Sequence, residues 1–237
     1  MNLRRAEGLP LVIGHRGAAA RAPENTLASL GAAVAAGADL VEFDVGRDLR
    51  LAHSPRERPL DNLSLDDALE FLAGAGVGVH VDAKAPGYEH AILDAIRRQG
   101  FEERAVVSTA FASSTRRLAQ LAPALPRAIG YPHDRYRISR FRWPTALSSA
   151  GAAALRQAMP ARVPLLIRWS RATVLSLHHT LCSRAAVAAS HRAGVPVFAW
   201  TVNDPAGVIR LSNAGVDAIV SDDPQMARET LGTLDSP

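Results

Sequence analysis

Short apolar segments alternate with longer segments of helical period along most of this chain. Apolar runs of this length, rich in Val, Ile and Leu, predict buried strands of a parallel sheet. The runs are Leu11–Ile13, Leu40–Val45, Leu51–His53, Val77–Val81, Ala105–Val107, Ala128–Tyr131, Thr173–Leu177, Val195–Trp200 and Ala218–Val220.

Segments between these runs are rich in Ala and Leu at helical spacing, and they predict the connecting helices. Several stop at a glycine just before the next strand, the ending expected of a helix-to-strand loop. The predicted helices are Asn25–Ala36, His90–Gln99, Thr115–Leu121, Ser183–Ala193 and Pro205–Ala214, and the glycines are Gly37, Gly100, Gly194 and Gly215.

Strand spacing selects the fold. Between Asp44 and His53 there is no room for the crossover that parallel strands need, so Leu51–His53 is expected to return as an antiparallel hairpin arm. Eight strands remain, which predicts a (β/α)8 TIM barrel of one domain, residues 1–237, with no large insertion domain. A doubly wound open sheet is the alternative, but no G-x-G-x-x-G follows the first strand.

Composition limits the possible classes of protein further. The chain has 237 residues, of which 48% are hydrophobic and 21% charged, so it is typical of a globular domain. Its single cysteine, Cys182, excludes an internal disulfide and a cysteine-based metal site. We find no signal-peptide pattern at the N-terminus and no apolar run long enough to span a bilayer, which predicts a soluble, cytoplasmic protein.

The formal net charge of +4 is unevenly distributed. From Arg135 to Asn203 there are ten arginines and no acidic residue, whereas the remainder of the chain carries −6. One surface could therefore meet a phosphate-bearing substrate, an anionic membrane or nucleic acid, and scattered solvated arginines are the simpler interpretation. Nucleic acid is disfavoured because no interleaved aromatic platform accompanies the arginines.

Acidic residues follow two of the predicted strands at the end where barrel enzymes place their active sites. Glu42 and Asp44 are two residues apart on one strand and so share a face, and Asp82 ends the next strand. Three converging carboxylates would repel one another unless they were protonated or held a cation. An all-oxygen ligand set favours one divalent cation, Mg²⁺ or Ca²⁺.

Two histidines and two cations belong to the same predicted site. His15 and His53 each follow an apolar strand, and a histidine pair can supply both a base and an acid. Lys84 is the only lysine beside 26 arginines, which suggests a position that needs a compact ammonium group. Arg16 could contact a phosphate with both of its terminal nitrogens.

The chain resembles the glycerophosphodiester phosphodiesterase family. The motifs that carry this resemblance occur in the family's order across nearly the whole chain: Gly14-His15-Arg16-Gly17, Pro23-Glu24-Asn25-Thr26, Gly37-Ala38-Asp39, Glu42-Phe43-Asp44-Val45, His53, Asp82-Ala83-Lys84, Trp200-Thr201-Val202-Asn203, Gly215-Val216-Asp217 and Ser221-Asp222-Asp223-Pro224.

The resemblance implies metal-dependent hydrolysis of a glycerophosphodiester, or of a lysophospholipid, to glycerol 3-phosphate or a lysophosphatidic acid and an alcohol. It implies that the substrate's own neighbouring hydroxyl attacks phosphorus and that water then opens the cyclic phosphate. The implied roles are acid-base catalysis by His15 and His53, cation binding by Glu42, Asp44 and Asp82, and substrate binding by Arg16, Lys84 and Trp200.

Three departures from the family pattern affect this expectation. The hairpin before His53 is short, Ser54 follows His53 where the family usually has Asp, and Asp82 stands where Glu is common. A second hypothesis is therefore a catalytically impaired barrel that binds an anionic lipid or phosphate.

Peripheral membrane contact is a separate expectation. Arg135–Trp143 and Val163–Trp169 combine arginines with aromatic or apolar residues, as segments that meet anionic membranes do. A helix covering the barrel wall is the alternative for Val163–Trp169. The oligomeric state, the identity of the ion and the leaving alcohol stay open.

Overall fold

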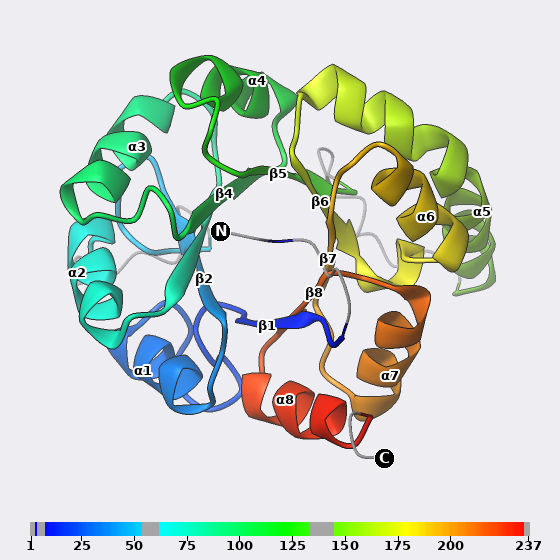
Figure 1. The fold of residues 1–237 in the computed structure, drawn as a ribbon, viewed down its shortest axis with the longest axis horizontal. Helices are drawn as coiled ribbons and strands as arrows, with labels where there is room; N and C mark the ends of the chain where they lie inside the picture. The colour runs from blue at the N-terminus through cyan, green and yellow to red at the C-terminus, as the bar shows by residue number, and fades with distance from the viewer. Residues whose placement is uncertain (1–2, 4–7, 54–61, 133–144, 235–237) are drawn as a thin grey trace.

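The computed structural model describes residue 3 and residues 8–53, 62–132 and 145–234. Eight parallel strands close into a barrel in chain order within this part of the chain. Helices follow the strands and form a ring outside them (Figure 1). This is the predicted (β/α)8 TIM barrel.

All eight predicted barrel strands are present. Their bounds are β1 Leu11–Gly14, β2 Leu40–Val45, β3 Gly78–Ala83, β4 Ala105–Thr109, β5 Arg127–Tyr131, β6 Val174–His178, β7 Val197–Trp200 and β8 Ala218–Ser221. The helices are α1 Leu27–Ala35, α2 Leu65–Ala75, α3 Glu89–Arg98, α4 Ala112–Leu121, α5 Thr145–Ser170, the 3₁₀ turn η2 His179–Leu181, α6 Arg184–Arg192, α7 Pro205–Ala214 and α8 Pro224–Gly232.

The hairpin arm is shorter than a strand. Val45 and Leu51 form an isolated antiparallel bridge, and Arg50 forms another with Ser64 at the start of α2. The chain therefore does turn back after β2, and His53 returns to the end of that strand. Residues 54–61, which follow His53, lie outside the described residues.

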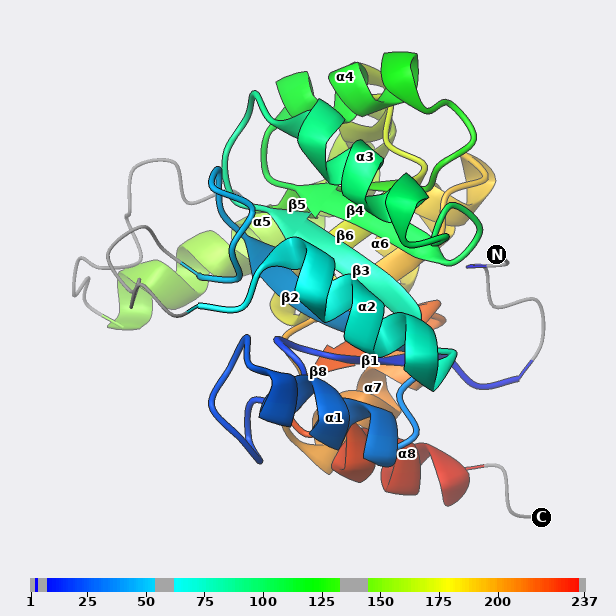
Figure 2. The same ribbon diagram turned by 90° about the vertical axis from the view of Figure 1, so that its left-hand side faces the viewer.

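Side chains alternate between two apolar environments along the strands. One set, including Ile13, Leu40, Val106 and Phe198, fills the inside of the barrel. The other set faces outward and packs under the helices, in one cluster beneath α1–α4 and another beneath α5–α8. Figure 2 shows this packing from the side, with α2 and α3 against the outer face of the sheet. Because the inner apolar residues fill the lower barrel, polar residues are confined to its carboxyl-terminal mouth.

Helix α5 contains the segment Val163–Trp169. This segment lies inside α5, where Met159 and Val163 are buried against the barrel and Leu165 and Trp169 are exposed. Val163–Trp169 therefore belongs to a helix that covers the barrel wall. The other candidate membrane segment, Arg135–Trp143, falls within the undescribed residues 133–144. Among the described residues, no helix is both long and apolar enough to cross a bilayer.

Candidate active site

A cavity of about 300 Å³ opens at the carboxyl ends of the strands. It contains most of the site residues predicted from the sequence, and Asp44 is fully buried beside it. The predicted residues that line it are His15, Arg16, Glu42, His53, Asp82, Lys84 and Trp200.

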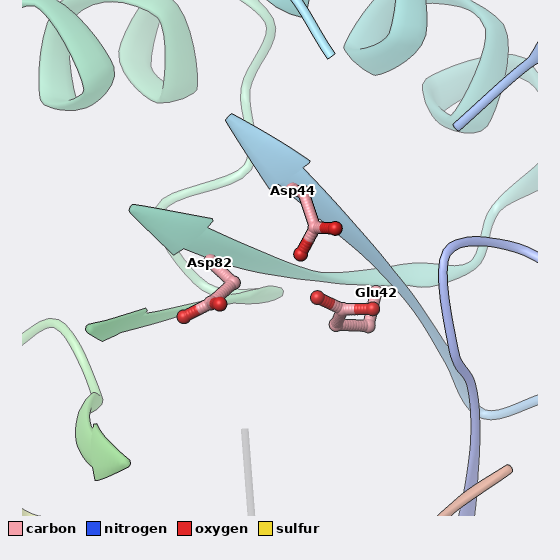
Figure 3. Close-up of side chains that lie close together, drawn as sticks. All are labelled: Glu42, Asp44 and Asp82. Carbon is pink, nitrogen blue, oxygen red and sulfur yellow. The ribbon is translucent and has the colours of Figure 1, made fainter. Parts of the chain in front are cut away.

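The three predicted carboxylates converge inside the barrel. Asp44 and Asp82 are paired in register on β2 and β3, and Glu42 lies one pleat deeper on the same face (Figure 3). One oxygen from each of Glu42, Asp44 and Asp82 lies within 4.8 Å of the others. Strand alternation thus brings together groups that would repel one another in the absence of compensating charge.

Lys84 supplies part of that compensation. Its ammonium forms ion pairs with both Asp44 and Asp82, and Ser108 donates a 2.6 Å hydrogen bond to the second of these carboxylates. Burial alone would raise the pKa of the two aspartates, but the Lys84 charge and the hydrogen bonds that they accept together outweigh it and lower both pKa values. Burial would lower the pKa of Lys84, and the surrounding carboxylates raise it instead.

The charge of the third carboxylate, Glu42, is not fully compensated. Burial, followed by the charge of Asp44, raises the pKa of Glu42 to about 7. Its Oε2 atom accepts a 2.7 Å hydrogen bond from the backbone N–H of Arg16. Lys84 and Arg16 are therefore too few to neutralise three carboxylates fully.

Arg16 lies in the loop after β1 and contacts several site residues. Its Nε atom is 3.0 Å from Asp44 Oδ2, Nη1 donates to Glu24 at 2.5 Å and Nη2 is 2.9 Å from His53 Nδ1. Its backbone has a φ of 50°, in the left-handed region. The loop thus holds the Arg16 guanidinium at the rim of the cavity, where a phosphate could reach it.

Helix α1 begins at the same loop and fixes its shape. Thr26 is the N-cap and forms a capping box with Ser29. Asn25 instead supports Asp44, accepting from its backbone N–H at 3.0 Å and donating to Oδ2 at 3.4 Å. Gly17, with a φ of 83°, lies so close to the Ser29 backbone that a Cβ atom would approach it to 2.4 Å.

His15 is held from behind by the loop after β8. Its Nδ1 atom is 2.6 Å from Asp222 Oδ1, and Nε2 is 4.0 Å from Glu42 Oε2. Asn203 donates to the other Asp222 oxygen and accepts from the Asp222 backbone N–H at 2.9 Å. Burial would lower the pKa of His15, but the Asp222 hydrogen bond and the Glu42 charge raise it. Nε2 is therefore the nitrogen that faces the cavity.

His53 reaches the same cavity from the hairpin arm. Its Nδ1 atom is 3.1 Å from Asp44 Oδ2 and its side chain is 45% exposed. The short arm is thus long enough to bring His53 beside the carboxylates, although Ser54 itself lies outside the described residues.

Trp200 forms part of the opposite wall. It ends β7, lines the cavity and also packs against the inner barrel residues. His178 meets its ring edge-on at a centroid distance of 5.1 Å. His178 and His179 are adjacent to this wall rather than to the carboxylates.

The sequence alone assigned no role to several residues of the site. Asp222 and Asn203 occur in quoted motifs, but their contact with His15 requires β8 to pair with β1. Because a closed barrel pairs its last strand with its first, the predicted fold could have indicated that these residues lie near His15. His80 likewise received no role from the sequence, yet it lines the cavity, and burial lowers its pKa to about 4.

The carboxylate cluster fits a divalent cation. Its oxygens are close together, come from strand positions inside the barrel, and belong to three carboxylates that only two permanent cations, Lys84 and Arg16, contact among the described residues. Carboxylate oxygens are ligands for hard ions such as Mg²⁺ and Ca²⁺. Glu42, Asp44 and Asp82 are therefore the residues that could hold a metal ion.

A closed parallel barrel with histidines, carboxylates and cations at its carboxyl-terminal mouth is the architecture of a TIM-barrel enzyme. The model of the glycerophosphoryl diester phosphodiesterase family matches residues 15–47 and 91–226. The chain belongs to this family, and it is thus a phosphoric diester hydrolase.

Individual relatives agree with this assignment. A glycerophosphodiester phosphodiesterase of Caldanaerobacter subterraneus is 26% identical over 255 residues, covering 91% of this chain and 95% of the relative.

Solved structures share the fold. One from Parabacteroides distasonis, a glycerophosphodiester phosphodiesterase, has a TM-score of 0.77 at 16% identity and covers 98% of this chain and 100% of that one. A phosphodiesterase from Oleispira antarctica, solved with the product sn-glycerol-3-phosphate, has a TM-score of 0.73 at 23% identity and covers 94% and 97%.

Proposed function

We propose that this chain hydrolyses glycerophosphodiesters to glycerol 3-phosphate and an alcohol, with His15 and His53 as the acid-base pair. The observation that carries the proposal is that both histidines line one cavity with the carboxylate cluster. The family match and the product-bound relative from Oleispira antarctica support the choice of substrate.

Lys84 and Arg16 are proposed to bind the phosphate. Both line the cavity, and both carry a positive charge beside the carboxylates. Their charges would stabilise the negative charge that builds on the phosphate oxygens during bond exchange. Phosphate binding requires each to share its hydrogen-bond donors between the carboxylates and the substrate.

The histidines move the protons. In the first step the glycerol hydroxyl next to the phosphate attacks phosphorus, one histidine takes its proton and the other protonates the departing alcohol. In the second step water opens the cyclic phosphate with the two roles reversed. At His15 the proton is exchanged at Nε2, because Nδ1 is held by Asp222. The internal nucleophile avoids the entropic cost of binding a second reactant for the first step.

Glu42, Asp44 and Asp82 are proposed to hold one divalent cation, Mg²⁺ or Ca²⁺. When bound, such an ion supplies Lewis-acid stabilisation of the phosphate oxygens. The residues that would hold it include Asp44 and Asp82, which contact Lys84, and Glu42, which lines the cavity that His15 and His53 share.

The test is hydrolysis of a panel of glycerophosphodiesters and lysophospholipids with added Mg²⁺, with added Ca²⁺ or with chelator. We expect chelation or His15→Ala to abolish release of the phosphorylated product. His90→Ala, on the exposed face of α3, is the matched control and should keep wild-type activity. Full activity after chelation would refute the metal requirement, and full activity of His15→Ala would refute the role of that histidine.

The same assay decides the alternative of an impaired anion-binding barrel. That protein would bind glycerol 3-phosphate in a calorimeter without turning over any diester in the panel. The contacts of His53 with Asp44 and Arg16 favour a working site, since they place it within the cavity despite its altered neighbourhood.

A further inference from the structure

His80 is a buried polar side chain that the proposed mechanism does not use. It lies on β3 with its side chain inside the barrel, and only 3% of its surface is exposed. Neither Nδ1 nor Nε2 has a hydrogen-bond partner among the described residues. Buried polar atoms without partners are rare in native proteins because each one loses its hydration uncompensated. The ring is therefore expected to have a partner that the described residues do not supply.

The position of His80 is the deep end of the active-site cavity. It precedes Asp82 by two residues on the same face of β3, and it is paired in register with Glu42. Ser176 and Val220 line the cavity from the opposite strands. This end of the cavity is closed by the apolar residues of the inner barrel, including Phe198, whose ring meets His80 edge-on at 5.8 Å.

Space is left at this depth by a glycine. Gly130 on β5 is paired with Ser176 on β6 and lines the same cavity. A Cβ atom placed on Gly130 would meet nothing closer than 3.7 Å. His80, Gly130 and Ser176 thus line one cavity, and Gly130 adds no side chain that would fill it.

The donors and acceptors at this end suit a hydroxyl group. A neutral imidazole offers one N–H donor and one acceptor nitrogen, and a serine hydroxyl offers both as well. A phosphate oxygen would satisfy only donors, and an ammonium only acceptors. An alkyl chain would leave every polar atom unpaired. A hydroxyl group can donate to one partner and accept from the other.

We propose that His80, together with Ser176, binds the terminal hydroxyl of the glycerol half of the substrate and makes this enzyme selective for it. The inference rests on the proposed function, because it takes the phosphate to lie at the level of Lys84 above His80. A closed end accommodates the end of a molecule, and the glycerol carbon chain ends in that hydroxyl. The departing alcohol then points toward the open mouth.

The experiment compares two substrates that carry the same leaving alcohol. One is a glycerol phosphodiester and the other its 2-hydroxypropyl counterpart, which keeps the attacking hydroxyl and lacks only the terminal one. The ratio of their kcat/KM values is measured for wild type, His80→Leu and His80→Gln. His90→Leu on the exposed face of α3 is the matched control, and circular dichroism confirms that each variant is folded.

Wild type is expected to prefer the glycerol diester by about tenfold or more, since a site built to bind a hydroxyl rejects the analogue that lacks it. His80→Leu should bring the ratio close to one, mainly by slowing the glycerol diester. His80→Gln, which keeps a donor and an acceptor, should retain most of the preference. Ser176→Ala should lower it partly, and His90→Leu should leave it unchanged.

A wild-type ratio near one, or a wild-type ratio retained by both His80→Leu and Ser176→Ala, would overturn the inference while leaving the hydrolase function intact. Calorimetric binding of sn-glycerol 3-phosphate and of 2-hydroxypropyl phosphate repeats the comparison without turnover. If wild type hydrolyses neither diester, the proposed function fails, and the binding ratio alone still decides the role of His80.

Discussion

Lys84 contacts Asp44 and Asp82 at once from a largely buried position. An ammonium group is a compact charge that can point all its donors at neighbouring oxygens, whereas a guanidinium is a wide planar fork. The space among three converging carboxylates suits the first shape. This explains physically why a chain with 26 arginines keeps one lysine at this position.

Lys84→Arg is therefore expected to preserve the charge and lose at least about tenfold in kcat/KM, because the larger group would displace Asp44 or Asp82. Steady-state kinetics on a glycerophosphodiester measures the effect. Arg97→Lys, at an exposed ion pair on α3, is the reciprocal control and should be silent. Wild-type kinetics in Lys84→Arg would show that charge alone is required.

Asp222 is expected to act through His15. Asp222→Asn keeps the shape of the side chain but removes the charge that fixes the Nδ1 proton of His15. We expect kcat to fall by roughly 10-fold to 100-fold with little change in KM, because orientation of the base matters most during proton transfer. Asp94→Asn on exposed α3 serves as the control. A change confined to KM would place Asp222 in substrate binding instead.

Glu42 makes stability depend on pH in the cation-free protein. Its pKa is raised from 4.5 to about 7, so between these values the folded state binds more protons than the unfolded state. The free energy of unfolding must then fall as pH rises through this window.

Glu42→Gln should remove that loss. Relative to wild type, the free energy of unfolding of the variant should therefore increase by up to about 3 kcal/mol between pH 5 and pH 8. Urea unfolding at both pH values in chelator measures it. Glu70→Gln, exposed on α2, should show no such pH-dependent gain. A constant difference between Glu42→Gln and wild type would contradict burial as the cause.

At the scale of elements, the loop between β1 and α1 shows how the site depends on close backbone packing. Gly17→Ala combines a left-handed φ of 83° with a contact of 2.4 Å to Ser29, whereas Gly37→Ala has a φ of 71° and nothing within 4 Å.

We expect Gly37→Ala to cost about 1 kcal/mol and Gly17→Ala about 2 to 4 kcal/mol, from backbone strain plus overpacking. The midpoints of urea denaturation measure both. Because Gly17 adjoins Arg16, only its variant should also lose activity. If Gly17→Ala and Gly37→Ala were equally destabilised, the loop after β1 would be able to shift and accommodate the added Cβ atom.

The strands were predictable from sequence and several helices were not. Strands β2 and β4, for example, are buried at every position, so they appear as mostly apolar runs bounded by turn residues. Helix α5 was missed over most of its length because Pro160 and Pro164 interrupt its pattern. Helices α2 and α8 were also not assigned, although Ser64 and Asp223 are recognisable N-caps.

At the scale of the whole molecule, barrel closure decides which site residues the sequence could reveal. Glu42, Asp44 and Asp82 were predictable together because their strands are consecutive. Asp222 was not assigned to His15, because 207 positions separate them and only the pairing of β8 with β1 joins them.

Two quoted motifs have their role at the other end of the barrel. Asp39, just before β2, accepts a 2.7 Å hydrogen bond from the backbone N–H of Val12 on the adjacent β1. Asp217, just before β8, accepts one of 2.7 Å from Val197 on the adjacent β7. These aspartates fix strand register and lie away from the cavity, so their motifs reflect the fold rather than the chemistry.

The charge of the carboxylate cluster finally couples cation binding to the stability of the whole barrel. An ion that binds only the folded state adds about 2.7 kcal/mol at 100 times its Kd. For a chain of this size that corresponds to a rise in Tm of roughly 5–10 °C. We expect Mg²⁺ or Ca²⁺ to raise the Tm of chelator-treated wild type, and the more effective ion to be the one that supports hydrolysis. Asp82→Asn should lose most of the rise, and Asp94→Asn should retain it. An equal rise in wild type and Asp82→Asn would place the cation elsewhere.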